Sequence, residues 1–148
     1  MEQVTDNQQK YLNYREQMQR LKKAIGSDFY LEAIFIEYAV MEDRLESIIR
    51  HSGQWNYKDG SYVSIEIKIK KVAKIAEEKR SVAHRYFTPE LTDAITEWKE
   101  RRNKLIHALM KQQLSTEELR NVAEDGYSLV KKLCSKSTSY KRKLASLV

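Results

Sequence analysis

The sequence predicts an all-α fold, a single antiparallel bundle of about five helices. Three observations predict it. Only 4 Gly and 1 Pro occur among 148 residues, so few chain-breaking loops are expected. Charged residues make up 32% of the chain, which is typical of helices with solvated faces. Apolar residues recur at helical spacing through most segments, and the length suits one domain spanning residues 1–148.

Two helices are expected before the first loop. The first runs from about residue 4 to 25 and is stopped by Gly26. Ser27 and Asp28 offer N-cap side chains for a second helix that reaches about His51. This second helix is apolar on nearly every side, so we expect it to lie in the centre of the bundle.

The stretch from about residue 62 to 80 has an ambiguous periodicity. Alternate positions from Val63 to Ile69 are apolar, as in a strand, whereas Val72, Ile75 and Ala76 follow helical spacing. A lone strand would have no partner in a helical chain, so the whole stretch is predicted to be a helix. Residues 81–87 are then expected to form a connection to the next helix.

A long helix is predicted from Thr88 to Gln113, with Thr88 as N-cap and Pro89 at the first helical position. One face carries an apolar stripe, which consists of Leu91, Ile95, Trp98, Leu105 and Leu109. Arg102 lies within this stripe, and a buried guanidinium is costly unless it is paired. Glu37 on the second helix is the best-placed acid to pair with it. The alternative is that Glu37 is an exposed edge residue held near Arg44.

The last helix is predicted to begin with a capping box, in which Ser115 caps the helix and Glu118 occupies the third position. Gly126 weakens the middle of this helix by roughly 1 kcal/mol relative to Ala. Beyond Asp125 there is no acidic residue, while basic residues accumulate. Residues of about 136–148 are therefore expected to be a frayed basic tail, either an RNA-binding extension or simply a soluble end.

The formal net charge of +6 is compatible with an acidic polymer as partner. Basic residues on the 88–113 helix are the candidates for nucleic-acid contacts: Lys99, Arg101, Lys104 and Lys111. A single Cys excludes an internal disulfide. The sequence contains no Cys/His cluster, so neither a metal site nor a cofactor is predicted. No apolar run is long enough to cross a membrane and no signal peptide is evident, so a cytoplasmic location is expected.

Arg102, Asn103 and His107 form the candidate catalytic set. Asn103 and His107 are four residues apart and share a helix face, whereas Arg102 and His107 point about 140° apart. Arg binds phosphate well, and His is the side chain that titrates near neutral pH. The two side chains could act on one phosphodiester if the helix faces a second helix or its own copy.

The string Arg102-Asn103-Lys104-Leu105-Ile106-His107 resembles the signature of the HEPN superfamily, which is Arg, a polar residue, three variable residues and His. The resemblance implies a small helical bundle and a metal-independent endoribonuclease that works as a dimer with the two motifs facing each other. It further implies that His107 is the general acid/base, that Arg102 stabilises phosphorane charge, and that Asn103 orients the His or the phosphate. A toxin or phage-defence role would follow, with a possible antitoxin partner.

One departure from the family is evident. Some HEPN proteins carry a Tyr two residues after the His, which a nucleotidyltransferase antitoxin modifies with AMP, and here that residue is Leu109. The alternative to a nuclease is a non-catalytic HEPN-fold adaptor that binds RNA, a nucleotide or a partner protein. A further alternative leaves Arg102 as a structural ion-pair residue and His107 as a surface histidine.

Overall fold

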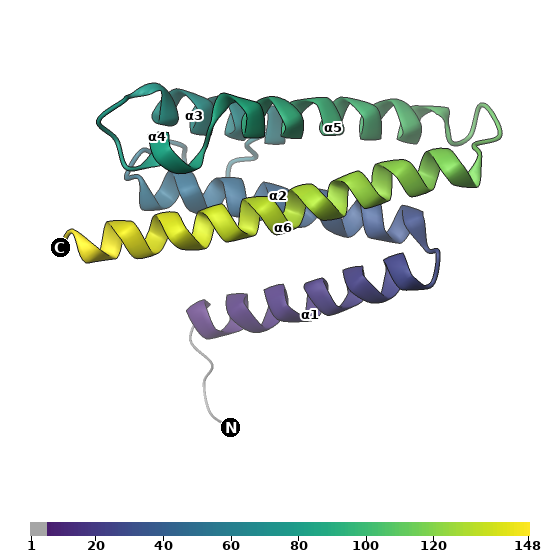
Figure 1. Cartoon of the computed structure of the whole chain (residues 1–148), viewed down its shortest axis with the longest axis horizontal. Coiled ribbons are helices and arrows are strands. Elements are labelled where there is room, and N and C mark those ends of the chain that lie inside the picture. The colour runs from purple at the N-terminus through teal and green to yellow at the C-terminus, as the bar shows by residue number, and fades with distance from the viewer. Residues whose placement is uncertain (1–5) are drawn as a thin grey trace.

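The computed structural model describes residues 6–148 and confirms the all-α bundle, with no strand in that range. Figure 1 shows the long helices lying roughly side by side, with α5 and α6 antiparallel. In chain order the helices are α1 (Asp6–Gly26), α2 (Tyr30–His51), α3 (Ile65–Glu77), α4 (Ala83–Tyr86), α5 (Pro89–Ala108) and α6 (Thr116–Ser146). The short helix α4 lies within the segment that was predicted to be a simple connection.

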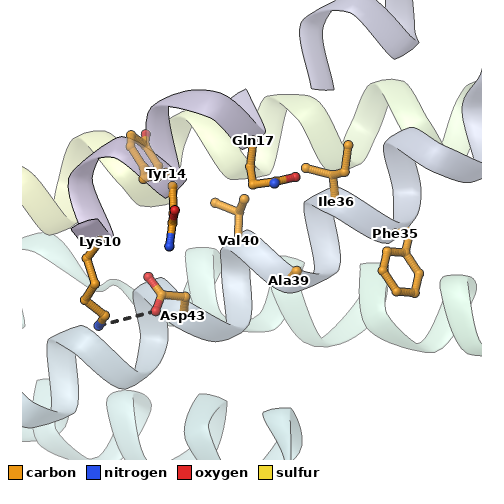
Figure 2. Close-up of a pocket in the computed structure, with 9 residues that line it drawn as sticks. Lys10, Tyr14, Gln17, Phe35, Ile36, Ala39, Val40 and Asp43 are labelled. Atoms are coloured by element: carbon orange, nitrogen blue, oxygen red, sulfur yellow. Dashed lines mark ion pairs between the residues drawn. The ribbon is translucent and has the colours of Figure 1, made fainter. Parts of the chain in front are cut away.

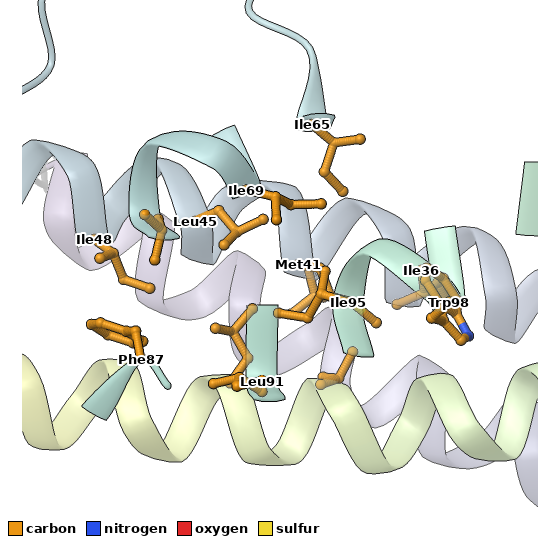
Figure 3. Close-up of a cluster of buried hydrophobic side chains, with 14 of the residues drawn as sticks. Ile36, Met41, Leu45, Ile48, Ile65, Ile69, Phe87, Leu91, Ile95 and Trp98 are labelled. Atoms are coloured by element: carbon orange, nitrogen blue, oxygen red, sulfur yellow. The ribbon is translucent and has the colours of Figure 1, made fainter. Parts of the chain in front are cut away.

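Helix α2 lies in the centre of the bundle, as predicted from its apolar faces. It packs against α1, α3 and α6, and its most extensive interface is with α6. Figure 3 shows Leu45 and Ile48 of α2 pointing into the same cluster as Ile95 and Trp98 of α5, all of them fully or almost fully buried. Burying apolar surface of this kind stabilises a fold by about 25 cal/mol per Å².

Helix α3 resolves the ambiguous stretch in favour of a helix. It begins at Ile65, where the Ser64 hydroxyl accepts a hydrogen bond from the Ile67 backbone N–H. Ile65 and Ile69 face the core, whereas Ile67 is 46% exposed. The alternating apolar residues therefore do not share one face, as they would in a strand.

The N-cap predicted for α2 is wrong. Phe29 occupies the N-cap position and makes no side-chain cap hydrogen bond. Asp28 instead adopts a left-handed backbone conformation, with φ 63°, and its carboxylate accepts a hydrogen bond from the Tyr30 hydroxyl at 2.7 Å. The Phe29 N–H bonds back to the Ala24 carbonyl, so this segment closes α1 rather than opening α2 with a side-chain cap.

The end of the chain also differs from its prediction as a frayed tail. Helix α6 continues to Ser146, and both Ser137 and Tyr140 are buried. The Tyr140 ring packs edge-on against Phe87, with 5.2 Å between ring centroids, and lies near Tyr86. These contacts join residues that are far apart in the sequence, and they hold the last turns of α6 on the bundle.

None of the helices within residues 6–148 combines the length and the apolar character that a membrane-spanning helix needs.

Candidate functional site around Arg102 and His107

Helix α5 presents the motif near its C-terminal end. The Thr88 hydroxyl caps the helix by accepting from the Leu91 N–H, and Pro89 occupies the first turn, as predicted. Trp98 is buried and its indole N–H donates to the Val122 carbonyl of α6 at 2.9 Å. This bond fixes α5 against α6 one turn before Arg102. The helix ends at Ala108, earlier than the predicted Gln113, and the chain then turns toward α6.

Arg102 packs against α2 without an acidic partner. Its guanidinium carbon lies 4.2 Å from the centroid of the Tyr38 ring, and Nη1 donates to the Asn103 Oδ1 at 3.0 Å. The Arg102 Nε–H is buried and has no hydrogen-bond acceptor. No carboxylate of residues 6–148 lies within ion-pair distance of Arg102. The guanidinium therefore keeps capacity for an external anion.

A groove of about 330 Å³ opens beside Arg102, between α2 and α3. It is lined by Phe35, Tyr38, Ala39, Glu42, Asp43, Glu46, Lys68 and Arg102. Its acids are already paired: the buried Lys68 Nζ lies 3.3 Å from both Glu42 and Glu46. Asp43 pairs with Arg44 and with Lys10. Burial alone would raise the pKa of Asp43, but these two cations outweigh it and lower the pKa. The carboxylates thus do not neutralise Arg102.

Glu37 does not pair with Arg102, and it is not an exposed edge residue, so both expectations for it are wrong. Its side chain is fully buried and neither carboxyl oxygen has a hydrogen-bond partner. It points at α6, where a Cβ built on Gly126 would lie 2.2 Å from the Glu37 Oε1. Burial, and secondly the charge of Asp125, raises the pKa of Glu37 to about 9. The acid is therefore neutral at physiological pH, a state that burial favours.

His107 differs from the other two histidines of the chain. The ring Nδ1 of His51 lies 2.8 Å from the Ser47 carbonyl, and that of His84 lies 2.7 Å from the Ala76 carbonyl. His107 is exposed, and its ring has no hydrogen-bond or ion-pair partner among residues 6–148. It is thus the histidine whose two ring nitrogens are both open to an incoming ligand.

The three motif residues are not brought together as one site within a single chain. Arg102 and His107 lie on one continuous helix, which keeps their side chains about 140° apart. Asn103 contacts Arg102 and not His107, so within the chain it positions the guanidinium. The arrangement holds an oriented cation on one side of α5 and a free imidazole on another.

The four predicted nucleic-acid contacts fall into two groups. Lys99 is buried, with its ammonium 3.9 Å from Glu66, so the prediction that it meets RNA does not hold in this structure. Arg101 is half-exposed and pairs with Asp125 at 2.7 Å. Lys104 and Lys111 are exposed. Only the last two remain freely available to a polyanion.

A second hollow, of about 250 Å³, lies between α1 and α2 (Figure 2). Tyr14, Phe35, Ile36 and Val40 make most of its wall apolar. Its charged groups are Lys10 and Asp43, which form an ion pair at 3.5 Å. Across residues 6–148 there is no group of three or more His, Cys, Asp or Glu side chains that could hold a metal ion. The hollow offers packing surface rather than reactive groups.

Comparison with known proteins gave no assignment. No protein-family model, curated protein or solved structure matches this chain. The resemblance to the HEPN superfamily therefore stays a prediction that depends on residues 102–107.

Sequence reasoning missed Tyr38 and took Lys68 for a solvent-facing lysine that could follow a phosphate backbone, whereas Lys68 is buried and paired with Glu42 and Glu46. Lys68 carried a usable signal, because it lies three residues after Ile65 and four before Val72, on the apolar face of α3. A lysine at such a position is expected to find an acid. Tyr38 carried no signal of its own, since its contact with Arg102 depends on how α2 and α5 are aligned.

The surroundings of Arg102 predict that Arg102→Ala costs little stability. The change removes a contact with Tyr38 and one side-chain hydrogen bond but strands no carboxylate. We expect a loss of about 1 kcal/mol in the free energy of unfolding. A urea titration of the variant and the wild type measures it. A loss of 3 kcal/mol or more, the magnitude typical of a broken buried ion pair, would show that an acid pairs with Arg102 after all.

Proposed function

We propose that this protein is a metal-independent endoribonuclease of HEPN type. The observation that carries the proposal is the pairing, on one helix, of an arginine without a carboxylate partner and a histidine without any partner. Arg102 keeps a buried, unsatisfied Nε–H, and His107 stands free in solvent. A guanidinium that no carboxylate neutralises and that lines an open groove favours a role in binding an anion such as phosphate.

In this proposal the 2′-hydroxyl of the RNA attacks the adjacent phosphorus, and the 5′-oxygen of the next nucleotide leaves. His107 takes the proton from the 2′-hydroxyl or gives one to the leaving oxygen. Arg102 stabilises the negative charge that develops on the phosphorane oxygens. Asn103 holds the Arg102 guanidinium through the 3.0 Å hydrogen bond. The exposed Lys104 and Lys111 add charge for the RNA backbone.

The proposed enzyme is a homodimer. One chain points Arg102 and His107 about 140° apart, so a two-fold axis beside α5 would bring the Arg of one chain near the His of the other. Apolar side chains next to the motif are exposed and suit such a contact: Ile106 is 40% exposed, Leu109 38% and Met110 92%. We expect light scattering at micromolar concentration to give twice the chain mass. A strictly monomeric species would remove this part of the proposal.

A change at His107 should separate catalysis from folding. We expect His107→Ala to abolish RNA cleavage in the presence of EDTA while changing the free energy of unfolding by no more than about 0.5 kcal/mol, because the side chain is exposed. His51→Ala is the matched control. His51 lies at the C-terminal end of α2, where its ring bonds the Ser47 carbonyl, so this variant should leave cleavage intact. If the wild type does not cut RNA although His107→Ala still binds it, the protein is a non-catalytic adaptor and not a nuclease.

The biological setting of the proposed nuclease is a toxin or phage-defence component acting in the cytoplasm, with an antitoxin as its possible regulator. Because Leu109 replaces the Tyr that some family members carry, AMP modification at that position is not expected. Co-expression with the product of the adjacent gene tests this setting: relief of growth inhibition by that product is the expected result. Growth inhibition that is absent even for the protein alone would count against a toxin.

A further inference from the structure

A groove between α1 and α6 combines aromatic rings with unpaired cations. It encloses about 370 Å³ and is lined by Tyr11, Tyr14, Arg15, Met18, Gln19, Lys22 and Tyr127. Figure 1 shows α1 and α5 on opposite sides of the bundle, so this groove does not share the surface that carries the motif. The groove contains no carboxylate in its lining.

The cations of the groove are free to bind an external anion. Arg15 and Lys22 are exposed, as is Lys131, which stands at the edge of the groove over the Tyr127 ring. None of the three lies within ion-pair distance of a carboxylate in residues 6–148. Arg20, on a neighbouring turn of α1, is by contrast paired with Glu16 at 3.2 Å. The groove therefore concentrates positive charge that the protein itself does not neutralise.

The rings of the groove are placed at two depths. Tyr14 is half-buried, with the Arg44 guanidinium carbon 5.1 Å from its ring centroid, so it forms part of the floor. Tyr11 is 60% exposed at the groove, which leaves a ring face open. Tyr127 lies under the Lys131 ammonium, 4.5 Å from the ring centroid. An exposed ring beside a row of cations is the combination that binds unstacked bases and their phosphates.

We propose that the α1–α6 groove binds a single-stranded RNA segment, with Arg15, Lys22 and Lys131 on the phosphates and Tyr11 stacked on a base. The choice of RNA rests on the proposed function, whereas the groove itself stands on the charges and rings described above. Single-stranded RNA fits better than a duplex, because the bases of a duplex are already stacked and leave the tyrosine face unused. The groove would bind one part of the RNA on the side of the bundle opposite α5, which carries the proposed catalytic residues.

The test uses a fluorescent 2′-O-methyl RNA of about 12 nucleotides, a length suited to one groove of this kind. It cannot be cleaved by attack of a 2′-hydroxyl, so a failure of the nuclease proposal does not affect the result. We compare the wild type with the triple variant Arg15→Gln/Lys22→Gln/Lys131→Gln. The matched control is Lys74→Gln/Lys79→Gln/Arg80→Gln, which removes the same charge from exposed residues of the α3 region.

We expect the groove variant to bind at least about tenfold more weakly than the control variant. The slope of log affinity against log salt should also fall by about 2, as expected when three phosphate contacts on a single strand are lost. Tyr11→Ala should weaken binding several-fold without changing the salt slope. Equal affinities of the two triple variants would overturn the proposal. So would equal binding of a duplex of the same sequence, or an unchanged affinity of Tyr11→Ala.

Discussion

Glu37→Gln is expected to stabilise the protein at pH 8 and to remove most of the pH dependence of its stability between about pH 5 and 9. Burial raises the pKa of Glu37 from 4.5 to about 9 in the folded state, whereas the unfolded chain keeps the ordinary value. Above pH 4.5 the unfolded state therefore binds fewer protons than the folded state, so the free energy of unfolding falls as pH rises. The fall amounts to about 1.4 kcal/mol per pH unit until the folded pKa is reached.

Gln keeps the shape of the neutral acid but cannot ionise. Glu37→Gln should therefore equal the wild type near pH 5 and exceed it by about 4 kcal/mol near pH 8. Urea titrations at several pH values measure the difference. Glu100→Gln, an exposed carboxyl on α5, is the control and should leave the pH profile of the wild type unchanged. Parallel profiles for Glu37→Gln and the wild type would contradict a buried neutral Glu37.

Gly126→Ala is expected to destabilise the protein by about 2 kcal/mol, although helix propensity alone favours Ala by roughly 1 kcal/mol. The added Cβ would lie 2.2 Å from the Glu37 Oε1 and 2.8 Å from Cζ2 of Trp98. Both neighbours are buried, and Trp98 is held by its bond to the Val122 carbonyl, so they have little room to move. Thermal or urea unfolding of the variant measures the change.

Gly26→Ala provides the control for Gly126→Ala, because a Cβ at Gly26 meets nothing within 4 Å. It should leave stability unchanged or raise it slightly. In a Glu37→Ala background the cost of Gly126→Ala should shrink, since the nearest clashing atoms are then absent. A Gly126→Ala variant that is more stable than the wild type would show that α2 and α6 do not approach as closely as described.

Local chemistry made part of this structure predictable. The caps at Thr88 and Ser115 were evident because each helix start is decided within four residues of sequence. The central place of α2 followed from its apolar faces. The start of α2 was not predictable in the same way, because Asp28 takes a left-handed conformation that closes α1.

Contacts between helices decided the features that the sequence did not reveal. Glu37 is buried because Gly126 leaves space on α6, and the two are far apart in the chain. Lys99 is likewise buried beside Glu66, a residue that is far from it in the chain. Arg102 does lie partly buried at the apolar stripe of α5, which the sequence marked as unusual. Its partner is the Tyr38 ring and not an acid, which depends on the alignment of α2 with α5.

We propose that the protein cleaves RNA through the 2′-hydroxyl, with His107 and without a metal ion. The most direct measurement is the analysis of product ends after the wild type is incubated in EDTA with a single-stranded RNA and with the same RNA carrying one 2′-deoxynucleotide at the cleaved position. We expect a 2′,3′-cyclic phosphate on the 5′ fragment and no cleavage at the deoxynucleotide. Absence of cleavage in EDTA, cleavage at the deoxynucleotide, or wild-type cleavage by His107→Ala would contradict it.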